Sequence, residues 1–187
     1  MTDRRVKYTK MVLRESLIQL LSHKPISRIT IKELCECADV NRATFYSHYT
    51  DQFDLLKNIE SEFIENINSY LDSFALEVRE NDLLQMVTKI FEYIARNSEL
   101  CRVLLGENGD IDFQTNIMRV ISERVIFEWQ KKKSVDEAII EYIYTYVATG
   151  SIGVVRKWLF DPNPETPRKM AEFVARLVNK GIWAFIV

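Results

Sequence analysis

Residues 30–56, TIKELCECADVNRATFYSHYTDQFDLL, limit the possible folds of this chain more than any other segment. The Thr30 hydroxyl can accept a hydrogen bond from a backbone N–H, and Glu33 three residues later completes a capping box. A short helix is therefore expected to begin directly after Thr30. Its apolar residues recur at three- and four-residue spacing, which predicts a buried stripe of Ile31, Leu34 and Ala38.

A tight turn and a second short helix follow directly. Residues 38–40 make the turn, where Asp39 is one of the few non-glycine residues that tolerate a left-handed backbone. Asn41 can cap the next helix, and we expect Ala43 and Phe45 to pack inward from it. The outward positions are then Arg42, Thr44, Tyr46 and His48. A two-turn helix with polar outer positions fits a DNA major groove.

These residues resemble the TetR/AcrR family of bacterial transcriptional regulators. They follow its T…A…GV…TFYxHFxxKxxLL pattern through Ile29, Thr30, Ile31, Leu34, Ala38, Val40, Ala43, Thr44, Phe45, Tyr46, His48, Tyr49, Asp51, Leu55 and Leu56. Two positions depart from the pattern, because Asp39 stands where the family usually has glycine and Gln52 where it usually has lysine. Gln52 removes a charge that relatives aim at a phosphate, so DNA affinity would be lower or carried elsewhere.

The resemblance implies an all-α fold with two domains. Residues 1–50 would form an N-terminal three-helix helix-turn-helix DNA-binding domain, and residues 51–187 a larger helical ligand-binding and dimerisation domain. The implied function is that of a sequence-specific DNA-binding transcriptional regulator, a ligand-responsive repressor that binds a pseudo-palindromic operator as a homodimer. Its implied partners are a double-stranded DNA operator, an unidentified small-molecule effector and a second copy of the chain.

By resemblance, the residues expected to contact DNA are Thr30, Lys32, Arg42, Thr44, Tyr46, His48 and Tyr49. Arg42 is the candidate for base reading, because its guanidinium can bind guanine O6 and N7 together. Thr44 could contact a thymine methyl group or a phosphate, whereas Tyr46, His48 and Tyr49 are expected at phosphates. The alternatives are packing against the first helix for both tyrosines and a hydrogen bond within the domain for His48.

Composition and charge favour a compact helical protein with one basic end. The 187 residues are 47% hydrophobic and include only 5 glycines and 4 prolines, which favours helices throughout. Residues 1–60 contain ten Lys/Arg against eight Asp/Glu, whereas the remainder contains 15 against 19. The basic start consists of Arg4, Arg5, Lys7 and Lys10. It could follow a phosphate backbone or be a solvated, disordered tail.

Amphipathic periodicity predicts further helices. They are expected over about 8–22, from 51 onward as a connecting helix, over 83–95, 99–105, 112–132 and 135–160, and from 167 onward. The stripe predicted for the connecting helix is Phe53, Leu56, Ile59, Phe63, Ile67, Tyr70, Leu71 and Phe74. Thr166 should cap the last helix, with Pro167 at its first position.

The last two helices are apolar on more than one side. We therefore expect two subunits to pack them into a four-helix interface. Gly150 and Gly153 lie in the first of these helices, where glycine weakens a helix unless another backbone approaches closely. A dimer is accordingly predicted.

Other features predict a cytoplasmic protein without cofactor or metal. The N-terminal residues lack the apolar core of a signal peptide, and no stretch approaches the roughly 18 apolar residues of a membrane span. The odd cysteine set of Cys35, Cys37 and Cys101 is expected to be reduced, with redox sensing by one of them as the alternative. Cys35 and Cys37 lie two residues apart on a helix, which directs them to different faces, so they are not expected to share a metal ion. The acidic loop at 106–110 lacks the spacing of an EF-hand.

Two other functional classes are alternatives to the DNA-binding regulator. An enzyme would need a nucleophile, base or metal constellation, and the two histidines, both in or beside the first 50 residues, provide none, so no enzymatic activity is expected. A TetR-fold coactivator or adaptor that acts through another protein is the stronger alternative, and Gln52 slightly favours it.

The effector site is not assigned from the sequence. Several polar or aromatic residues lie within apolar helices and could line a pocket, although each is more often a core or surface residue. They are Tyr93, Asn97, Gln114, Met118, Arg119, Trp129, Tyr142, Tyr146 and Thr149.

Overall fold

The computed structural model describes residues 2–72, 80–106, 109–130 and 137–183, and all regular structure within these ranges is helical. The helices are α1 (Thr2–Leu21), the 3-10 turn η1 (Ile26–Arg28), α2 (Ile31–Cys37), α3 (Arg42–Tyr46), α4 (Gln52–Asp72), α5 (Glu80–Arg96), α6 (Ser98–Leu105), α7 (Ile111–Gln130), α8 (Glu137–Leu159) and α9 (Pro167–Trp183). The predicted all-α fold is confirmed. The lysines at 131–133 and the apolar residues Phe74 and Phe185 lie outside the described ranges.

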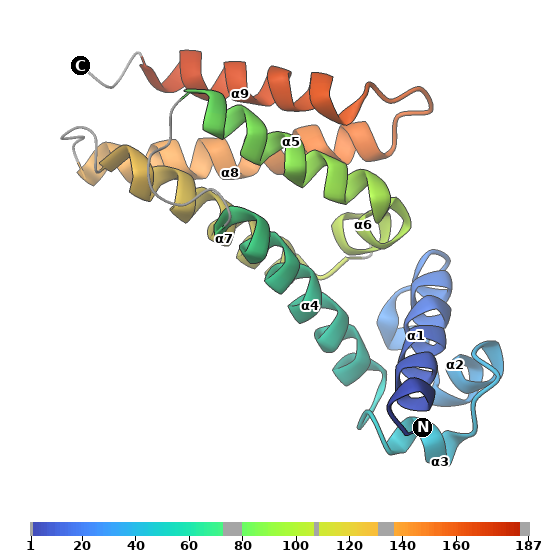
Figure 1. Ribbon diagram of the computed structural model, residues 1–187. Helices are drawn as coiled ribbons and strands as arrows, with labels where there is room; N and C mark the ends of the chain where they lie inside the picture. The colour runs from blue at the N-terminus through green and yellow to red at the C-terminus, as the bar shows by residue number, and fades with distance from the viewer. Residues whose placement is uncertain (1, 73–79, 107–108, 131–136, 184–187) are drawn as a thin grey trace.

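Helices α1, α2 and α3 form a small unit, here called the head (residues 2–50), at one end of the molecule (Figure 1). Leu13 and Leu17 of α1 are fully buried, as the amphipathic pattern predicted. Leu34 of α2 and Phe45 of α3 are also fully buried and belong to the same apolar cluster. Two short helices are thus held in place by packing against a longer one, because neither would be stable alone in water.

The long helix α4 runs from the head into the larger helical unit, here called the body (described residues 80–183) (Figure 1). It begins with two reciprocal side-chain bonds, since Asp51 Oδ1 accepts from Asp54 N at 2.8 Å and Asp54 Oδ2 accepts from Thr50 N at 2.9 Å. Its buried stripe recurs every four residues and comprises Leu55, Ile59, Phe63, Ile67 and Leu71. The connecting helix predicted from residue 51 is therefore confirmed.

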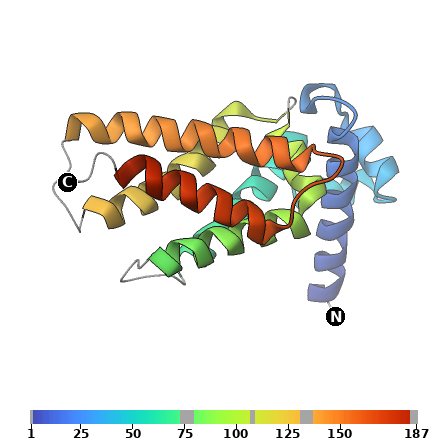
Figure 2. The same ribbon diagram turned by 90° about the horizontal axis from the view of Figure 1, so that it is seen from above.

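In the body, α9 packs along α5 and also contacts α8, while α7 packs on α8 (Figures 1 and 2). Aromatic side chains join these layers. The Phe63 ring of α4 lies 5.3 Å from the Tyr93 ring of α5 and 5.8 Å from the Phe113 ring of α7. The Phe91 ring lies 5.1 Å edge-on to that of Trp158. The linking helix thus shares one apolar core with the body.

The turn between α6 and α7 depends on close backbone contacts. A Cβ atom on Gly109 would clash with the Leu104 carbonyl oxygen. Glycine, which has no Cβ atom, is therefore the residue that fits this turn without a shift of the backbone. The buried Gln114 side chain donates from Nε2 to the carbonyl oxygens of Leu104 at 3.0 Å and Gly106 at 3.3 Å. Gln114 therefore provides hydrogen-bond donors to the carbonyl groups at the end of α6. This is a structural role for a residue that the sequence also offers for an effector site.

Two expectations about the helices were wrong. Helix α1 begins at Thr2 and not near Tyr8, so Arg4, Arg5 and Lys10 are exposed residues of a helix and not of a disordered tail. Phe53 is 49% exposed, although it was assigned to the buried stripe of α4. It lies two residues before Leu55, and a two-residue step of about 200° places it on the opposite side of the helix.

The end of α8 and the start of α9 follow the sequence signals. Lys169 N donates to Thr166 Oγ1 at 3.4 Å, and Pro167 is the first residue of α9, as predicted. Trp158 Nε1 donates to the Glu165 carbonyl oxygen at 2.7 Å across the connecting loop. This bond fixes the angle at which α9 turns back onto α5.

We predict that Glu60→Gln will stabilise the protein above pH 7. Burial and the nearby Asp110 carboxylate raise the Glu60 pKa from 4.5 to about 7, and Oε1 is buried without a partner. As pH rises from 4.5 towards 7, the unfolded chain loses this proton first, so stability falls and the full cost is present above pH 7. After allowance for water around a half-buried group, the expected gain is on the order of 1–2 kcal/mol.

Urea unfolding at pH 8 and pH 4.5 measures this gain. Glu65→Gln is the matched control, because Glu65 is exposed on the same helix. Equal stability of wild type and Glu60→Gln at pH 8 would contradict the prediction.

Candidate nucleic-acid interface

The turn between α2 and α3 has the left-handed residue that the sequence predicted. Asp39 has φ 51°, and it is the one non-glycine residue with positive φ among the described residues. Ala38 N and Val40 N close the end of α2 by donating to the carbonyl oxygens of Leu34 and Cys35, each at 3.0 Å. The chain thereby reverses within three residues and starts α3 at a defined angle to α2.

Side-chain caps fix the starts of both helices. Glu33 N donates to Thr30 Oγ1 at 3.2 Å, and Ala43 N donates to Asn41 Oδ1 at 2.8 Å, so both predicted N-caps are confirmed. The Glu33 carboxylate forms an ion pair with Lys24 Nζ at 2.5 Å. That pair ties α2 to the loop after α1.

Phe45 anchors α3 in the head. Its side chain is fully buried, and its ring lies 5.5 Å from that of Tyr46 and 5.9 Å from that of Tyr49. With Phe45 directed inward, Arg42 is exposed, Tyr46 is 57% exposed, and Thr44 and His48 are half-buried. These four side chains remain accessible around one buried anchor, although the helix has only five residues.

The expectation that Ala43 packs inward was wrong, because Ala43 is exposed. A step of two residues along a helix is about 200°, so Ala43 and Phe45 lie on opposite sides of α3. This orientation could have been inferred from the sequence, because the position of Phe45, the large apolar residue of α3, fixes which side of the helix faces the core. Ala43 thus adds a methyl group to the exposed side of α3, between Arg42 and Thr44.

Thr30 and Lys32 lie at the start of α2 and are both exposed. Lys32 Nζ is 3.8 Å from Glu36 Oε1, and both side chains are 67% exposed. Such a surface pair contributes little to stability, so the Lys32 ammonium can exchange this partner for a phosphate at small cost. The Thr30 hydroxyl accepts the capping bond and still has its O–H to donate.

Tyr49 occupies a different environment from the other sequence-selected residues. It is only 7% exposed, and its backbone N donates to the Phe45 carbonyl oxygen at 3.0 Å. Burial raises the Tyr49 pKa, with further increases from the carboxylates of Asp54 and Glu62 and an opposing effect from Arg14. This burial favours the alternative that Tyr49 packs within the head over a contact with a DNA phosphate.

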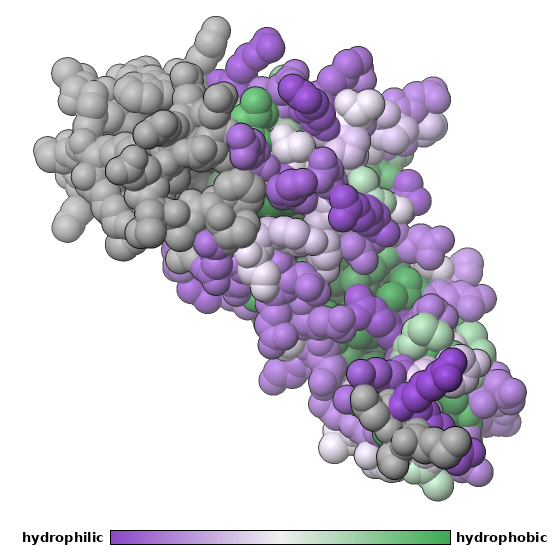
Figure 3. Space-filling view, viewed as in Figure 1, coloured by the Kyte–Doolittle hydropathy of each residue, from purple (hydrophilic) through white to green (hydrophobic). Residues whose placement is uncertain are grey.

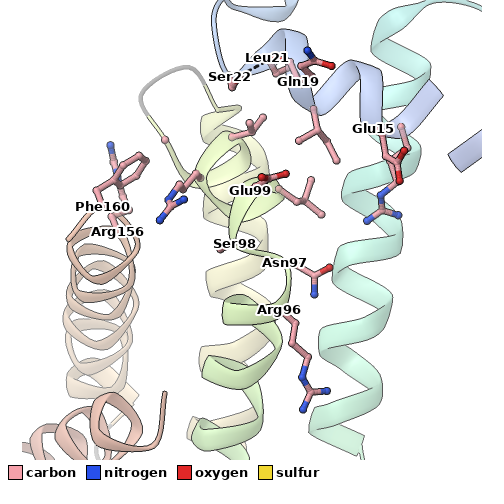
Figure 4. A pocket seen from close by; sticks show the side chains of 16 residues that line it. Glu15, Gln19, Leu21, Ser22, Arg96, Asn97, Ser98, Glu99, Arg156 and Phe160 are labelled. Carbon is pink, nitrogen blue, oxygen red and sulfur yellow. Dashed lines mark hydrogen bonds between the residues drawn. The ribbon is translucent and has the colours of Figure 1, made fainter. Parts of the chain in front are cut away.

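A large groove, here called the polar groove because most of its lining residues are polar, lies between the head and the body (Figure 4). Its volume is about 1250 Å³, and its walls come from α1, the α5–α6 junction, α6 and the end of α8. Charged residues of both signs line it, including Glu15, Arg96, Glu99 and Arg156. On its body side, Arg102 Nε donates to the Leu159 carbonyl oxygen at 2.9 Å.

The residues considered for an effector pocket are dispersed. Met118 lines a cavity in the body and Asn97 lines the polar groove, while Tyr142 and Tyr146 are 80% and 70% exposed. Tyr93 is buried in the aromatic core, where burial raises its pKa to about 12. The side chain of Trp129 lies outside the described residues. No cluster of histidine, cysteine or acidic residues able to hold a metal ion occurs in the described part of the chain.

Comparison with known proteins identifies the family. Residues 81–180 match a TetR family model described as the transcriptional regulator C-terminal region. The chain belongs to the TetR family of transcriptional regulators. The predicted family and its class of function, a helix-turn-helix regulator and not an enzyme, are thereby confirmed.

A curated relative of this TetR-family chain is the probable HTH-type transcriptional regulator YttP of Bacillus subtilis (strain 168). It is 26% identical over 137 residues, which are 71% of this chain and 63% of the relative. The chain thus spans less than two thirds of the length of the curated relatives that it matches.

Two solved structures have the same fold. A TetR transcriptional regulator from Streptococcus agalactiae 2603V superimposes with a TM-score of 0.69 at 20% identity, covering 95% of this chain and 97% of that chain. The regulator FadR from Bacillus subtilis, solved in complex with stearoyl-CoA, superimposes with a TM-score of 0.68 at 14% identity, covering 92% and 98%. Among the described helices, none is both long and apolar enough to span a membrane.

We predict that Asp39→Val will destabilise the protein by about 1–2 kcal/mol, because a β-branched residue is strained in the left-handed region. Asp39→Gly, the residue that relatives usually have here, should be at least as stable as wild type. Urea unfolding of the three proteins measures the difference. Equal stability of the valine and glycine variants would show that the turn relaxes without cost.

Proposed function

We propose that this TetR-family regulator is a ligand-responsive repressor that binds a pseudo-palindromic operator as a homodimer. The main support is the geometry of α2 and α3, in which two capped helices meet at a left-handed turn and one large apolar anchor leaves the polar side of α3 exposed. A helix presented in this way can enter the DNA major groove.

Within this proposal the contact residues divide by chemistry. Arg42 reads a base, because its exposed guanidinium can bind guanine O6 and N7 together. Thr44 and the exposed Ala43 methyl group contact a thymine methyl or the adjacent backbone. The phosphate contacts are assigned to Thr30, Lys32, Tyr46 and His48. Tyr49 supports α3 from behind by packing against Phe45.

The dimer is supported by an exposed apolar stripe on α8. Ile139, Tyr142 and Tyr146 are 40%, 80% and 70% exposed, and they continue at helical spacing into Gly150 and Gly153. A Cβ atom added at either glycine would meet nothing within 4 Å in the described part of the chain. Close backbone approach at these glycines, as the sequence suggested, would therefore come from a second copy. The neighbouring helix α9 adds Phe173 and Leu177, which are 51% and 47% exposed.

A twofold dimer would place two α3 helices about 34 Å apart, which is one turn of DNA. The operator-bound dimer blocks transcription, and an effector in the body releases it by changing the separation of the two heads. Helix α4 connects the two events, since it begins beside α3 and ends in the body core. The FadR structure in complex with stearoyl-CoA supports small-molecule binding by a regulator of this fold.

We predict that Arg42→Ala will weaken operator binding by roughly 1–3 kcal/mol and relax specificity at one base pair per half-site. Selection from sheared source-genome DNA provides the operator, and fluorescence anisotropy with single-base variants measures affinity. Lys32→Ala is the control, because loss of a phosphate contact weakens all sequences alike and lowers the salt slope by about 1. A uniform loss for Arg42→Ala would make Arg42 a phosphate contact.

The same titration tests the adaptor alternative. Counterion release gives real phosphate contacts a steep salt dependence. An enriched pseudo-palindrome whose binding falls with salt supports the repressor. If no sequence is enriched at low salt, the proposed repressor is rejected in favour of a protein-binding adaptor. Gln52 is compatible with such an adaptor.

We predict that wild type sediments as a dimer at tens of micromolar and that Tyr146→Glu sediments as a monomer, because the substitution buries two like charges about a twofold axis. Sedimentation equilibrium is the measurement. Tyr8→Glu is the matched control, since Tyr8 is 63% exposed on α1, away from the α8 stripe. A wild-type monomer would contradict the proposed dimer. A dimer unaffected by Tyr146→Glu would place the interface elsewhere.

A further inference from the structure

The body contains a partly open cavity of about 90 Å³. Every helix from α4 to α9 contributes to its wall. Most of the described lining residues are aliphatic or aromatic, and they include Phe63, Ile67, Met86, Val87, Met118 and Ala175. The cavity is thus bounded by α4, which continues to the head, and by α8 and α9, which carry the exposed apolar residues.

The chemistry of this wall is unusually uniform. Among the described residues that line the cavity, Ser151 is the one with a polar side chain, and none carries a charge. A carboxylate, phosphate or ammonium group placed here would lose its hydration without gaining an ion pair, which is strongly unfavourable. The wall therefore excludes charged ligands and accepts at most one hydroxyl group, beside Ser151.

The size of the cavity restricts the ligand further. An apolar cavity of about 150 Å³ in another protein stays free of water and binds benzene. The present cavity is somewhat smaller, but Met86 and Met118 lie in its wall, and methionine side chains readily change rotamer to fit an irregular ligand. A molecule with the bulk of one aromatic ring or a short alkyl chain fits these limits.

We propose that the effector of this regulator is a small, uncharged, hydrocarbon-like molecule that binds in this cavity against Phe63 and Ile67 of α4. This inference rests on the proposed ligand-responsive function and names its ligand class. The polar groove in Figure 4 fits such a ligand less well, because charged side chains of both signs line it beside the apolar ones.

The position of the cavity explains how occupancy reaches the DNA-binding end. Phe63 and Ile67 lie on the same stripe as Leu55 and Ile59, and all four are at most 3% exposed. On the head side, the Arg14 guanidinium of α1 forms an ion pair with Glu62 of α4. Helix α4 is thus held by contacts with both the head and the body. A ligand that displaces the middle of α4 therefore changes the position of the head relative to the body.

The test uses toluene together with 1-hexanol and hexanoate, two probes that differ chiefly in charge. Thermal unfolding of the full chain at pH 8 is followed as each probe is titrated. We expect toluene and 1-hexanol to raise the midpoint in a saturable way, because they bind the folded state alone, and hexanoate to leave it unchanged. Equal or tighter binding of hexanoate would overturn the proposed ligand class.

Cavity-filling variants keep this test specific. Ala175→Phe places a ring in the cavity from α9, and Val87→Phe does so from α5, so one informative variant remains if the other fails to fold. Each should weaken toluene binding by tenfold or more. Ser151→Ala, which removes the single hydroxyl, should retain it. If no probe raises the wild-type midpoint, the cavity is only a packing void and the proposal fails.

Operator binding is measured separately, first without a probe and then with toluene. Tight binding that weakens by tenfold or more with toluene, in wild type but not in Val87→Phe, supports the proposal. Toluene binding without any change in operator affinity would overturn its role as an effector. Failure to bind DNA without a probe would instead overturn the proposed repressor function. The ligand class of the cavity would still be tested by the thermal unfolding measurements.

Discussion

The buried stripe of α4 is the contact on which the rest of this structure depends. Leu55, Ile59, Phe63, Ile67 and Leu71 recur every four residues and are at most 3% exposed, so one helix is packed over its full length. Burial of each such side chain contributes about 1.5–3 kcal/mol. Neither end of α4 can therefore turn freely, and a displacement in the body must be transmitted to the head or be absorbed in strained packing.

The parts that could be predicted from the sequence are those governed by nearest neighbours. The Thr30 and Asn41 caps, the left-handed Asp39 and the Thr166–Pro167 start of α9 each depend on a few adjacent residues, and all were found. Errors arose where the direction of a side chain depends on packing around a helix. The sequence predicts inward positions for Ala43 and Phe53 because they are small or apolar, yet each lies two residues from a buried anchor, Phe45 or Leu55.

The body shows a different limit of sequence reasoning. Its cavity is formed where side chains from six helices fail to fill one volume, and no single segment encodes that volume. The same holds for the groove between head and body, whose walls lie up to 146 positions apart, from Arg14 to Phe160. The sequence search for an effector site favoured polar residues. Gln114 proved to cap α6, and the cavity is lined almost entirely by aliphatic and aromatic residues.

The two proposed ligands of this chain require opposite chemistry. In the proposed function, DNA contacts exposed polar and basic groups on α2 and α3, whereas the cavity offers almost no polar atoms. The two ligands would therefore not compete for the same side chains. Long-range charge effects cannot couple them either, because an uncharged molecule brings no charge to the body. In the surface of Figure 3, hydrophilic residues cover most of the described face, with apolar residues showing only in small areas. In the proposed mechanism the coupling is therefore mechanical. An effector shifts α4, and the shift changes the separation of the two heads that bind the operator.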